Sequence, residues 1–363
     1  MTDTIDLLLA GGGTGGHTTA GAVIAAIARD LGYSVAWAAR ADSYEATVAA
    51  ENGIRFEPVP AFRLQPKNAA RVARSVVTAR GLIRRWRPRL VVATGSWVCV
   101  PVAFGAKLAR VPLVVHEQTL IPGSATTFLS RFARETWLTW AASAGAFHGV
   151  TVHTGFPLRP VLRQPVARAD GLARFGLADA PTLFVAGGGS GAESLNAYVA
   201  RHLGELLGPW QIIHQAGTSP NLTTTVTVLE QAKAALPEAL RARYHVAGYL
   251  DGEHVNAALR SAALTLARAG AGFVNEVGQL GSEAVLVPYP HSVNGEQDAL
   301  ARELTVTGQV TVWDDADLRN DNPERLAALL HWTPLTPTGV TSPVVPTDEA
   351  VDRIAGRLTA LLG

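Results

Sequence analysis

A glycine-rich turn near the N-terminus, Gly-Gly-Gly-Thr-Gly-Gly-His at residues 11–17, constrains the fold more than any other stretch. It follows an apolar run at 5–10, typical of a buried strand, and precedes residues 20–31, whose apolar positions recur at helical spacing. In such a strand–turn–helix unit, backbone amides and the positive helix end can hold an anion, and glycine permits close approach of a phosphate. The same pattern also fits a turn that only packs a helix on a sheet.

A second glycine-rich turn, Gly-Gly-Gly-Ser-Gly-Ala at 187–192, follows another apolar run at 182–186. Apolar runs alternate with amphipathic stretches along the whole chain, which predicts parallel sheets covered by helices. A chain of 363 residues is too long for one ordinary core. We therefore predict an α/β protein with two Rossmann-like domains facing across a cleft, each beginning with a glycine turn after its first strand.

The net charge of +1 conceals an asymmetry between the two halves of the chain. Residues 1–160 carry 17 basic and 9 acidic residues, whereas residues 161–363 carry 14 and 21. Residues 58–116 contain no acidic residue and eleven lysines and arginines. A positive field of this extent favours an anionic partner, which could be a lipid, a nucleic acid or a phosphorylated substrate.

Three features bear on the cellular compartment. The single cysteine, Cys99, excludes an internal disulfide framework and is typical of a reducing cytosol. The N-terminus lacks a basic segment followed by an apolar one, so we expect no secretory signal. The longest apolar region, 90–115, is interrupted by prolines and charges, which predicts buried strands around a helix rather than a membrane span.

The basic stretch at 68–87 predicts a helix that docks on an anionic membrane surface. Its predicted membrane-facing residues are the cations Arg71, Arg74, Arg80, Arg84 and Arg85 and the apolar residues Val76, Leu82, Ile83 and Trp86. The alternative is an ordinary amphipathic helix whose apolar side faces its own core.

Further polar residues follow predicted strands in the second half. A third glycine turn, 270–272, precedes Glu276 by one helical turn, so its amides could hold a pyrophosphate while the carboxylate accepts hydrogen bonds from ribose hydroxyls. Glu296 and Gln297 begin another predicted helix after a strand, and Arg159 lies in a proline- and arginine-rich stretch at 157–168 that is typical of a linker. A surface glutamate and a solvated linker arginine are the alternatives.

Motifs from both halves occur in order along the chain. They are GGGTGGH at 11–17, HEQ at 116–118, TGFPLR at 154–159, GGGSGAESLN at 187–196, HQAG at 214–217, RAGAGFVNEV at 268–277, VPYPH at 287–291 and EQ at 296–297. Together they resemble the MurG family of peptidoglycan glycosyltransferases, within glycosyltransferase family 28, over residues 5–312 with matched spacing.

The resemblance implies the GT-B fold, with an N-terminal acceptor- and membrane-facing domain over 1–158 and a UDP-sugar-binding domain over 159–346. It implies that a last helix, within 347–363, crosses back to the N-terminal domain. It also implies inverting transfer of N-acetylglucosamine from UDP-N-acetylglucosamine to a lipid-linked muramyl-peptide. The enzyme would then act as a peripheral protein on the cytoplasmic membrane face, in the cell-wall synthesis that cell shape and division require. The implied partners are the UDP-sugar donor, the lipid-linked acceptor and anionic inner-leaflet lipid, with no nucleic acid.

The resemblance also assigns donor-binding residues, which lie in the glycine turns and in the loops after predicted strands. They are Thr14, Gly15, Gly16, Thr119, Arg159, Gly189, Ser190, Leu250, Ala271, Gly272, Phe273, Val274, Asn275, Glu276, Glu296 and Gln297. Leu250 would present backbone groups to uracil, Ala271 and Gly272 would present amides to phosphate, Glu276 would hold the ribose, and Glu296 with Gln297 would contact sugar hydroxyls.

Glycosyl transfer also needs a base that accepts the proton of the acceptor hydroxyl. His17 is the first candidate by residue type and Glu117 the second, although His17 could equally contact phosphate or have a structural role. No carboxylate pair suited to a divalent metal accompanies the motifs, so we predict no obligatory cofactor or metal, with UDP-N-acetylglucosamine as a substrate.

Some positions depart from the family pattern. Thr119 stands where the family has asparagine after HEQ, Phe156 replaces the asparagine of TGNP, and Gly189-Ser190 replaces Ser-Gln. A site built to bond a hydroxyl discriminates strongly through that bond, so lost amides can change the donor or acceptor. Two alternatives therefore stay open: a related UDP-sugar glycosyltransferase with another glycolipid or aglycone acceptor, and a non-catalytic nucleotide-sugar-binding homologue.

Overall fold

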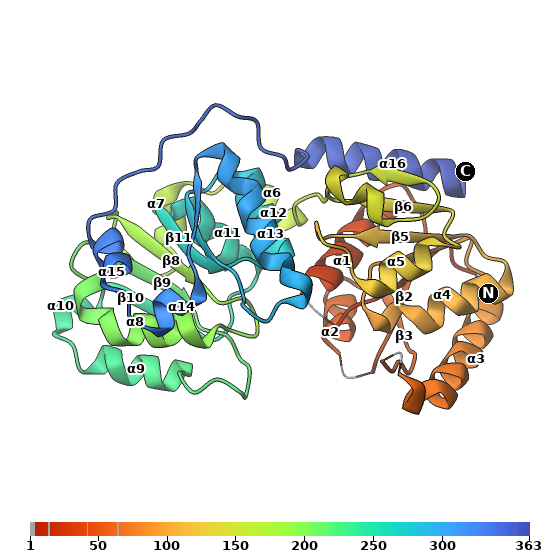
Figure 1. Ribbon diagram of the computed structural model, residues 1–363, viewed down its shortest axis with the longest axis horizontal. Helices are drawn as coiled ribbons and strands as arrows, with labels where there is room; N and C mark the ends of the chain where they lie inside the picture. The colour runs from red at the N-terminus through yellow and green to blue at the C-terminus, as the bar shows by residue number, and fades with distance from the viewer. Residues whose placement is uncertain (1–3, 14, 42, 64) are drawn as a thin grey trace. The chain divides into compact units, whose positions relative to one another are not determined.

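The computed structural model describes residues 4–13, 15–41, 43–63 and 65–363. The chain forms two compact units: unit 1 extends to Arg159 and resumes at Val344, and unit 2 is Pro160–Pro343. Each unit contains one parallel sheet with helices packed against it (Figure 1). This architecture confirms the predicted α/β fold of two Rossmann-like domains.

Unit 1 has a seven-stranded sheet in the order β3-β2-β1-β4-β5-β6-β7. Its strands are β1 (Leu7–Ala10), β2 (Val35–Ala39), β3 (Arg55–Pro58), β4 (Leu90–Ala93), β5 (Leu113–Glu117), β6 (Glu135–Leu138) and β7 (Thr151–His153). Its α-helices are α1 (Gly15–Asp30), α2 (Tyr44–Glu51), α3 (Ala69–Trp86), α4 (Val100–Ala109), α5 (Ser124–Ser130) and α16 (Thr347–Leu362). Short 3-10 helices occur at Pro66–Asn68, Trp97–Cys99 and Ala141–Ala146.

The two faces of this sheet form separate apolar cores because successive strand residues point to opposite sides. On β1, Leu7 and Leu9 pack in one core with Trp37, and Leu8 packs in the other with Trp86. All five side chains are fully buried. A parallel sheet with both faces covered needs near-continuous apolar strands, which explains the unbroken apolar runs in the sequence.

The last helix, α16, packs on unit 1 against α1 (Figure 1). Its buried residues Ile354, Leu358 and Leu362 recur every four positions and join the core that contains Ile24 of α1. The C-terminal helix therefore returns to the N-terminal domain, as the sequence predicts. At the start of this return, Gly155 has φ +72° and contacts Val345 so closely that a Cβ there would lie 2.5 Å from the valine side chain.

Unit 2 has a six-stranded parallel sheet in the order β10-β9-β8-β11-β12-β13. Its strands are β8 (Thr182–Ala186), β9 (Gln211–Gln215), β10 (Tyr244–Ala247), β11 (Leu264–Arg268), β12 (Ala284–Val287) and β13 (Val310–Val312). Its α-helices are α6 (Pro160–Arg163), α7 (Arg168–Ala173), α8 (Glu193–Leu206), α9 (Val226–Ala234), α10 (Glu238–Arg241), α11 (Gly252–Ser261), α12 (Ala271–Leu280), α13 (Glu296–Leu304), α14 (Asp315–Arg319) and α15 (Pro323–Leu330). Val293–Gly295 and Thr305–Thr307 are 3-10 helices.

The structure corrects one sequence interpretation of this region. Residues 157–168 are not an extended linker, because α6 and the start of α7 fall within or beside them. Asn256 of α11 donates from its side chain to the carbonyls of Val161 and Gln164, both at 2.9 Å. These bonds fold the proline-rich stretch onto unit 2.

In both sheets, the chain adds strands first on one side of the sheet's first strand and then on its other side. In unit 1 the chain proceeds outward from β1 through β2 to β3 and then returns to β4 on the other side of β1. In unit 2 it proceeds from β8 to β10 and returns to β11 beside β8. Open parallel sheets bind ligands beyond the carboxyl ends of the strands at such a switch point. Both glycine-rich turns follow the first strand at this position.

Candidate functional site

The candidate site of unit 1 is built from loops that leave β1, β4 and β5. Gly11, Gly12 and Gly13 all have positive φ between 86° and 140°, which lets the chain leave β1 and enter α1 within a few residues. Gly15 and Gly16 open α1, so their amides belong to the positive end of that helix. Thr14, also predicted to bind the donor, lies outside the described residues.

A buried carboxylate that the sequence analysis missed shapes this turn. Glu45 of α2 is 2% exposed and accepts hydrogen bonds from the Gly13 amide at 2.6 Å and the Thr18 hydroxyl at 2.8 Å. Gly12 packs against the same side chain, where a Cβ would come within 2.1 Å of it. No sequence motif marks Glu45, because its role depends on α2 lying beside the turn.

His17, the first candidate for the base, lies in the first turn of α1 and is half-buried. Its Nδ1 is 2.5 Å from the side-chain oxygen of Gln118, which follows β5. The Gln118 nitrogen lies 2.9 Å from the Thr94 carbonyl and 2.7 Å from Nδ1 of His116. The glutamine of the HEQ motif thus contacts the histidine that ends the glycine-rich motif at 11–17.

The buried His116 ring is neutral at physiological pH. Burial lowers the pKa of His116 to about 4, although the backbone of Gly155 opposes the shift. A neutral ring has one nitrogen without a proton, which can accept a hydrogen bond from the Gln118 side chain.

Glu117, the second candidate for the base, occupies the last position of β5 and is 1% exposed. Its carboxylate accepts hydrogen bonds from the Thr119 amide and hydroxyl, the Gly123 amide and the Thr126 hydroxyl, at 2.5–3.2 Å. Both carboxylate oxygens are thereby engaged with the loop between β5 and α5. This geometry favours His17 over Glu117 as the base, and Thr119, predicted to bind the donor, lies 7% exposed inside the same network.

In unit 2, the second glycine turn packs backbone to backbone against the loop after β9. The amides of Thr218 and Ser219 donate to the carbonyls of Gly189 and Ser190 at 3.0 and 3.2 Å. A Cβ on Gly217 would lie 2.1 Å from the Gly191 backbone, so the approach requires glycine. Gly189 and Ser190 remain exposed, as a donor contact requires.

The third glycine turn leads into α12, whose first turn contains Ala271, Gly272 and Phe273. All three are partly exposed, and the positive end of this ten-residue helix lies beyond the carboxyl end of β11. Val274 and Asn275 are 0% and 1% exposed. Their side chains therefore pack inside unit 2, and their role as donor contacts stays a prediction.

Five other predicted donor residues lie on α12, just before α11, at the start of α13 and at the end of the first segment of unit 1. Glu276 is on the second turn of α12 and is 7% exposed, and Leu250 is buried just before α11. Glu296 and Gln297 begin α13, and the Gln297 side-chain oxygen accepts a hydrogen bond from the Tyr289 amide at 2.9 Å. This bond closes the loop after β12 onto α13. Arg159, half-buried, ends the first segment of unit 1.

A buried ionic cluster that the sequence analysis did not assign braces these loops. Arg268, at the end of β11, lies 2.6 Å from the Asp315 carboxylate and 2.7 Å from the Ser194 hydroxyl, which itself donates to Asp315. Burial raises the pKa of Asp315, but the Ser194 bond and the Arg268 charge outweigh it and hold the pKa below its ordinary value. Arg268 also donates to the carbonyls of Val287 and Pro288.

The basic helix α3 has the predicted cations on its surface, since Arg71, Arg74, Arg84 and Arg85 are exposed and Arg80 is half-buried. Three of the four predicted apolar contacts are wrong, however. Leu82, Ile83 and Trp86 are 5%, 1% and 0% exposed and pack in the core beneath α3. The C-terminal half of the helix thus has the alternative role of covering its own sheet.

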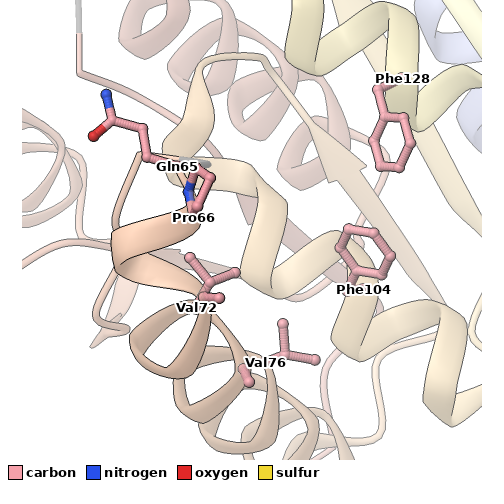
Figure 2. A pocket seen from close by; sticks show the side chains of 8 residues that line it. Gln65, Pro66, Val72, Val76, Phe104 and Phe128 are labelled. Carbon is pink, nitrogen blue, oxygen red and sulfur yellow. The ribbon is translucent and has the colours of Figure 1, made fainter.

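The apolar surface of α3 that remains open belongs to its N-terminal half. A groove of about 540 Å³ there is lined by Gln65, Pro66, Ala69, Val72, Ala73, Val76, Phe104 and Phe128. Figure 2 shows Val72 and Val76 of α3 facing Phe104 and Phe128 across this groove. Lys107 and Arg131 lie over the neighbouring rings of Phe132 and Phe128, at 4.2 and 5.7 Å, so cations flank the apolar surface.

The structure also bears on metal binding and on membrane insertion. Within the described ranges, no group of three or more histidine, cysteine, aspartate or glutamate residues is arranged to hold a metal ion. In the same part of the chain, no helix combines the length and the apolar character needed to cross a bilayer.

Known proteins resemble both units. Residues 7–137 match the glycosyltransferase family 28 N-terminal domain, and residues 182–332 match its C-terminal domain. The UDP-N-acetylglucosamine–N-acetylmuramyl-(pentapeptide) pyrophosphoryl-undecaprenol N-acetylglucosamine transferase of Roseiflexus sp. is 33% identical, over 85% of this chain and 83% of its own. The enzyme of that name from Chlorobium luteolum is 31% identical over 98% of this chain and 99% of its own. The crystal structure of Acinetobacter baumannii MurG shares the fold, with a TM-score of 0.66, 23% identity and coverage of 96% and 94%.

Proposed function

The chain belongs to glycosyltransferase family 28, and on this basis we propose that it transfers N-acetylglucosamine from UDP-N-acetylglucosamine to a lipid-linked muramyl-peptide. The observation that carries this proposal is the 31% identity, over 98% of this chain, to the N-acetylglucosamine transferase of Chlorobium luteolum. The product is the lipid-linked disaccharide precursor of peptidoglycan, on which cell shape and division depend.

The chemistry of unit 2 fits the donor. UDP departs with negative charge on its terminal phosphate, and oriented amides at a helix end stabilise such charge. The first turn of α12, at Ala271 and Gly272, offers these amides beyond β11. Glu276, on the next turn of α12, holds the ribose hydroxyls, and the Gln297 amide with Glu296 contacts the sugar. The Arg268–Asp315 pair keeps the loops that carry these groups in place.

The chemistry of unit 1 fits the acceptor. In an inverting transfer, the acceptor oxygen attacks the anomeric carbon, the bond from that carbon to UDP breaks, and a base takes the hydroxyl proton. His17 is the base because its ring is partly exposed at the switch point of the sheet. The charge of the leaving UDP is balanced by helix amides, so the reaction needs no resident metal. EDTA should leave the rate unchanged.

The basic face of unit 1 fits a peripheral position on the cytoplasmic side of the membrane. Anionic headgroups attract Arg71, Arg74 and their neighbours, each by roughly 1 kcal/mol close to the surface. The groove between α3 and Phe104 then receives apolar chains at the interface. This assignment keeps Val76 as an apolar contact and replaces Leu82, Ile83 and Trp86 with Val72 and Phe128.

The test is an assay of UDP release by the purified protein with a lipid-linked muramyl-pentapeptide in mixed micelles. We expect release that requires both the acceptor and UDP-N-acetylglucosamine, and a product whose new bond has the opposite anomeric configuration to the donor. UDP-glucose as the only active donor would instead favour the related glycosyltransferase. Binding of UDP-N-acetylglucosamine by calorimetry without UDP release would contradict the proposed activity and favour a nucleotide-sugar-binding homologue.

A further inference from the structure

We propose that Gln118 is a positioning residue that holds the His17 ring in its Nδ1–H tautomer and leaves Nε2 as the nitrogen that accepts the proton. The inference rests on the proposed function, because it assigns a partner to the base of that reaction. It concerns only unit 1, where α1 carries His17 and Gln118 follows β5.

The contacts of the Gln118 side chain determine which of its ends faces His17. One end lies 2.9 Å from the Thr94 carbonyl and 3.1 Å from the His116 carbonyl. Two carbonyl oxygens would repel the oxygen of the amide, so the end they contact must be the NH₂ group. The oxygen of Gln118 is therefore the atom that lies 2.5 Å from Nδ1 of His17.

This orientation determines where the His17 proton lies. An amide oxygen only accepts hydrogen bonds, so Nδ1 must carry a hydrogen to bond with it at 2.5 Å. In the neutral ring, the other nitrogen, Nε2, then has a lone pair. A base must present such a lone pair to the hydroxyl that it deprotonates. Gln118 thus selects the His17 tautomer in which Nε2, the ring nitrogen that does not face Gln118, is the basic one.

Two neighbours make the arrangement rigid. His116 is neutral because of its burial, and its Nδ1 accepts from the Gln118 NH₂ group at 2.7 Å, so the amide is anchored on a second side. Gly95 packs against the His17 ring, where a Cβ would lie 2.7 Å from both Nδ1 and Cε1. The ring therefore lies between the Gln118 oxygen and the backbone of the loop after β4.

The direct test is a long-range ¹H–¹⁵N NMR spectrum of the full-length protein with ¹⁵N-labelled histidine, at a pH where His17 is neutral. The His17 signals are identified by their loss in His17→Phe. We expect Nδ1 to have the shift of a protonated ring nitrogen and Nε2 that of an unprotonated one. The reverse pattern in the wild-type protein would overturn the proposal.

Two variants test the effect on turnover. Gln118→Met keeps the shape of the side chain but removes its oxygen, so the His17 tautomer should lose its preference. We expect kcat to fall by roughly 10- to 100-fold, the usual cost of removing a group that orients a functional histidine, with the KM for UDP-N-acetylglucosamine within about twofold. Gln118→Glu retains an oxygen toward Nδ1 when its carboxyl is protonated, because the O–H then replaces the NH₂ group as donor to the Thr94 carbonyl. It should therefore restore the tautomer and part of kcat.

Gln211 provides a matched control in unit 2. It is a buried glutamine whose NH₂ group donates to the carbonyls of Ala178 and Ala180 and to Thr182, at 2.7–3.2 Å. Gln211→Met removes a comparable set of bonds at the amino end of β9, so it should lower the thermal midpoint and leave kcat unchanged. An equal loss of kcat in both variants would mean that Gln118 acts only through stability.

The failures of the two proposals can be told apart. An inactive protein whose His17 has the Nδ1–H tautomer in wild type and loses it in Gln118→Met would contradict the function and support the positioning role. An active enzyme whose kcat and His17 tautomer are both unaffected by Gln118→Met would contradict the positioning role alone. If Gln118→Met does not fold, the wild-type spectrum and the Gln118→Glu variant still decide the question.

Discussion

Arg357 on α16 forms an ion pair with Glu135 on β6, a residue 222 positions earlier in the chain. The Glu135 carboxylate has only 6% of its side chain exposed and also accepts a hydrogen bond from the Trp137 indole at 3.0 Å. This pair and the apolar contacts of Ile354 and Leu358 fix the last helix on the N-terminal unit. The pair is one of several polar contacts of this helix, together with the bonds from Arg353 to the His153 carbonyl and from the Leu158 amide to the Thr347 hydroxyl.

Breaking this pair should destabilise unit 1. Arg357→Ala leaves a buried carboxylate without its cation, which we expect to cost about 2 kcal/mol, below the full value for a buried pair because Arg357 is itself partly exposed. The amides of α16 should exchange faster in hydrogen-exchange experiments. Glu349→Gln is the control on the same helix, since it removes only the surface pair with Arg353 and should cost about 0.5 kcal/mol. Equal losses in the two variants would contradict this assignment.

Glu276 should contribute to donor binding rather than to turnover. If its carboxylate accepts hydrogen bonds from the ribose, Glu276→Ala loses about 1.5–3 kcal/mol, and the Kd for UDP should rise roughly 10- to 100-fold. Isothermal titration with UDP measures this change. Glu253→Ala, an exposed glutamate of unit 2 paired with Arg174, is the control and should leave the Kd unchanged. An unchanged Kd for UDP in Glu276→Ala would show that Glu276 does not bind the ribose.

The sequence predicts the fold well where elements are long and strongly periodic. The helical spacing at 20–31 is found in α1, which ends at Asp30, and the apolar run at 182–186 is strand β8. The return of the last helix is also predicted, but through family resemblance rather than periodicity. Short elements carry too few residues to show a period, which explains why strand β6 and the proline-bounded helix α6 were not anticipated.

In the candidate site too, some features can be predicted from the sequence and others cannot. Glycine turns and helix starts are visible in sequence because they need particular residue types at particular spacings. Glu45 and the Arg268–Asp315 pair are not visible, because each depends on two elements that only the fold brings together. Amphipathicity likewise shows that α3 has an apolar side but not what covers it. Trp86 proved to lie in the core, whereas Val76 lines a groove.

A buried histidine in unit 2 should make stability depend on pH. Burial lowers the pKa of His214 from 6.5 to about 3. Between these values the unfolded chain binds one proton more than the folded unit, so the free energy of unfolding decreases as the pH falls below 6.5. The loss should reach about 2 kcal/mol at pH 5, at 1.36 kcal/mol for each pH unit.

The variant His214→Phe shows how much of the pH dependence of stability is due to His214. It loses the contacts with Tyr244 and Asn196, so its stability should be lower at pH 7. Its free energy of unfolding should, however, decrease less between pH 7 and pH 5 than that of the wild type, by about 2 kcal/mol. Urea unfolding monitored by hydrogen exchange of unit 2 amides measures both values. An unchanged difference between the two pH values would show that another group carries the dependence.

Membrane binding should depend on the charge at the N-terminal half of α3. Arg71→Glu replaces an attractive charge beside the groove with a repulsive one, which should cost roughly 2 kcal/mol and weaken binding to phosphatidylglycerol-rich vesicles about 30-fold at low salt. Arg241→Glu changes the net charge equally but lies at the end of α10 in unit 2, so it should bind as the wild type does.

The groove itself is tested by Val76→Ser, a change at its apolar wall. It should weaken vesicle binding even at high salt, because the lost contribution is hydrophobic and salt screens only the ionic part. Leu108→Ser is the control: this residue of α4 is 56% exposed, and it does not line the groove. If Leu108→Ser weakened sedimentation with vesicles as much as Val76→Ser, general surface hydrophobicity rather than the groove would account for the binding. If neither variant had an effect, the attraction would be purely ionic and the groove would have no part in it.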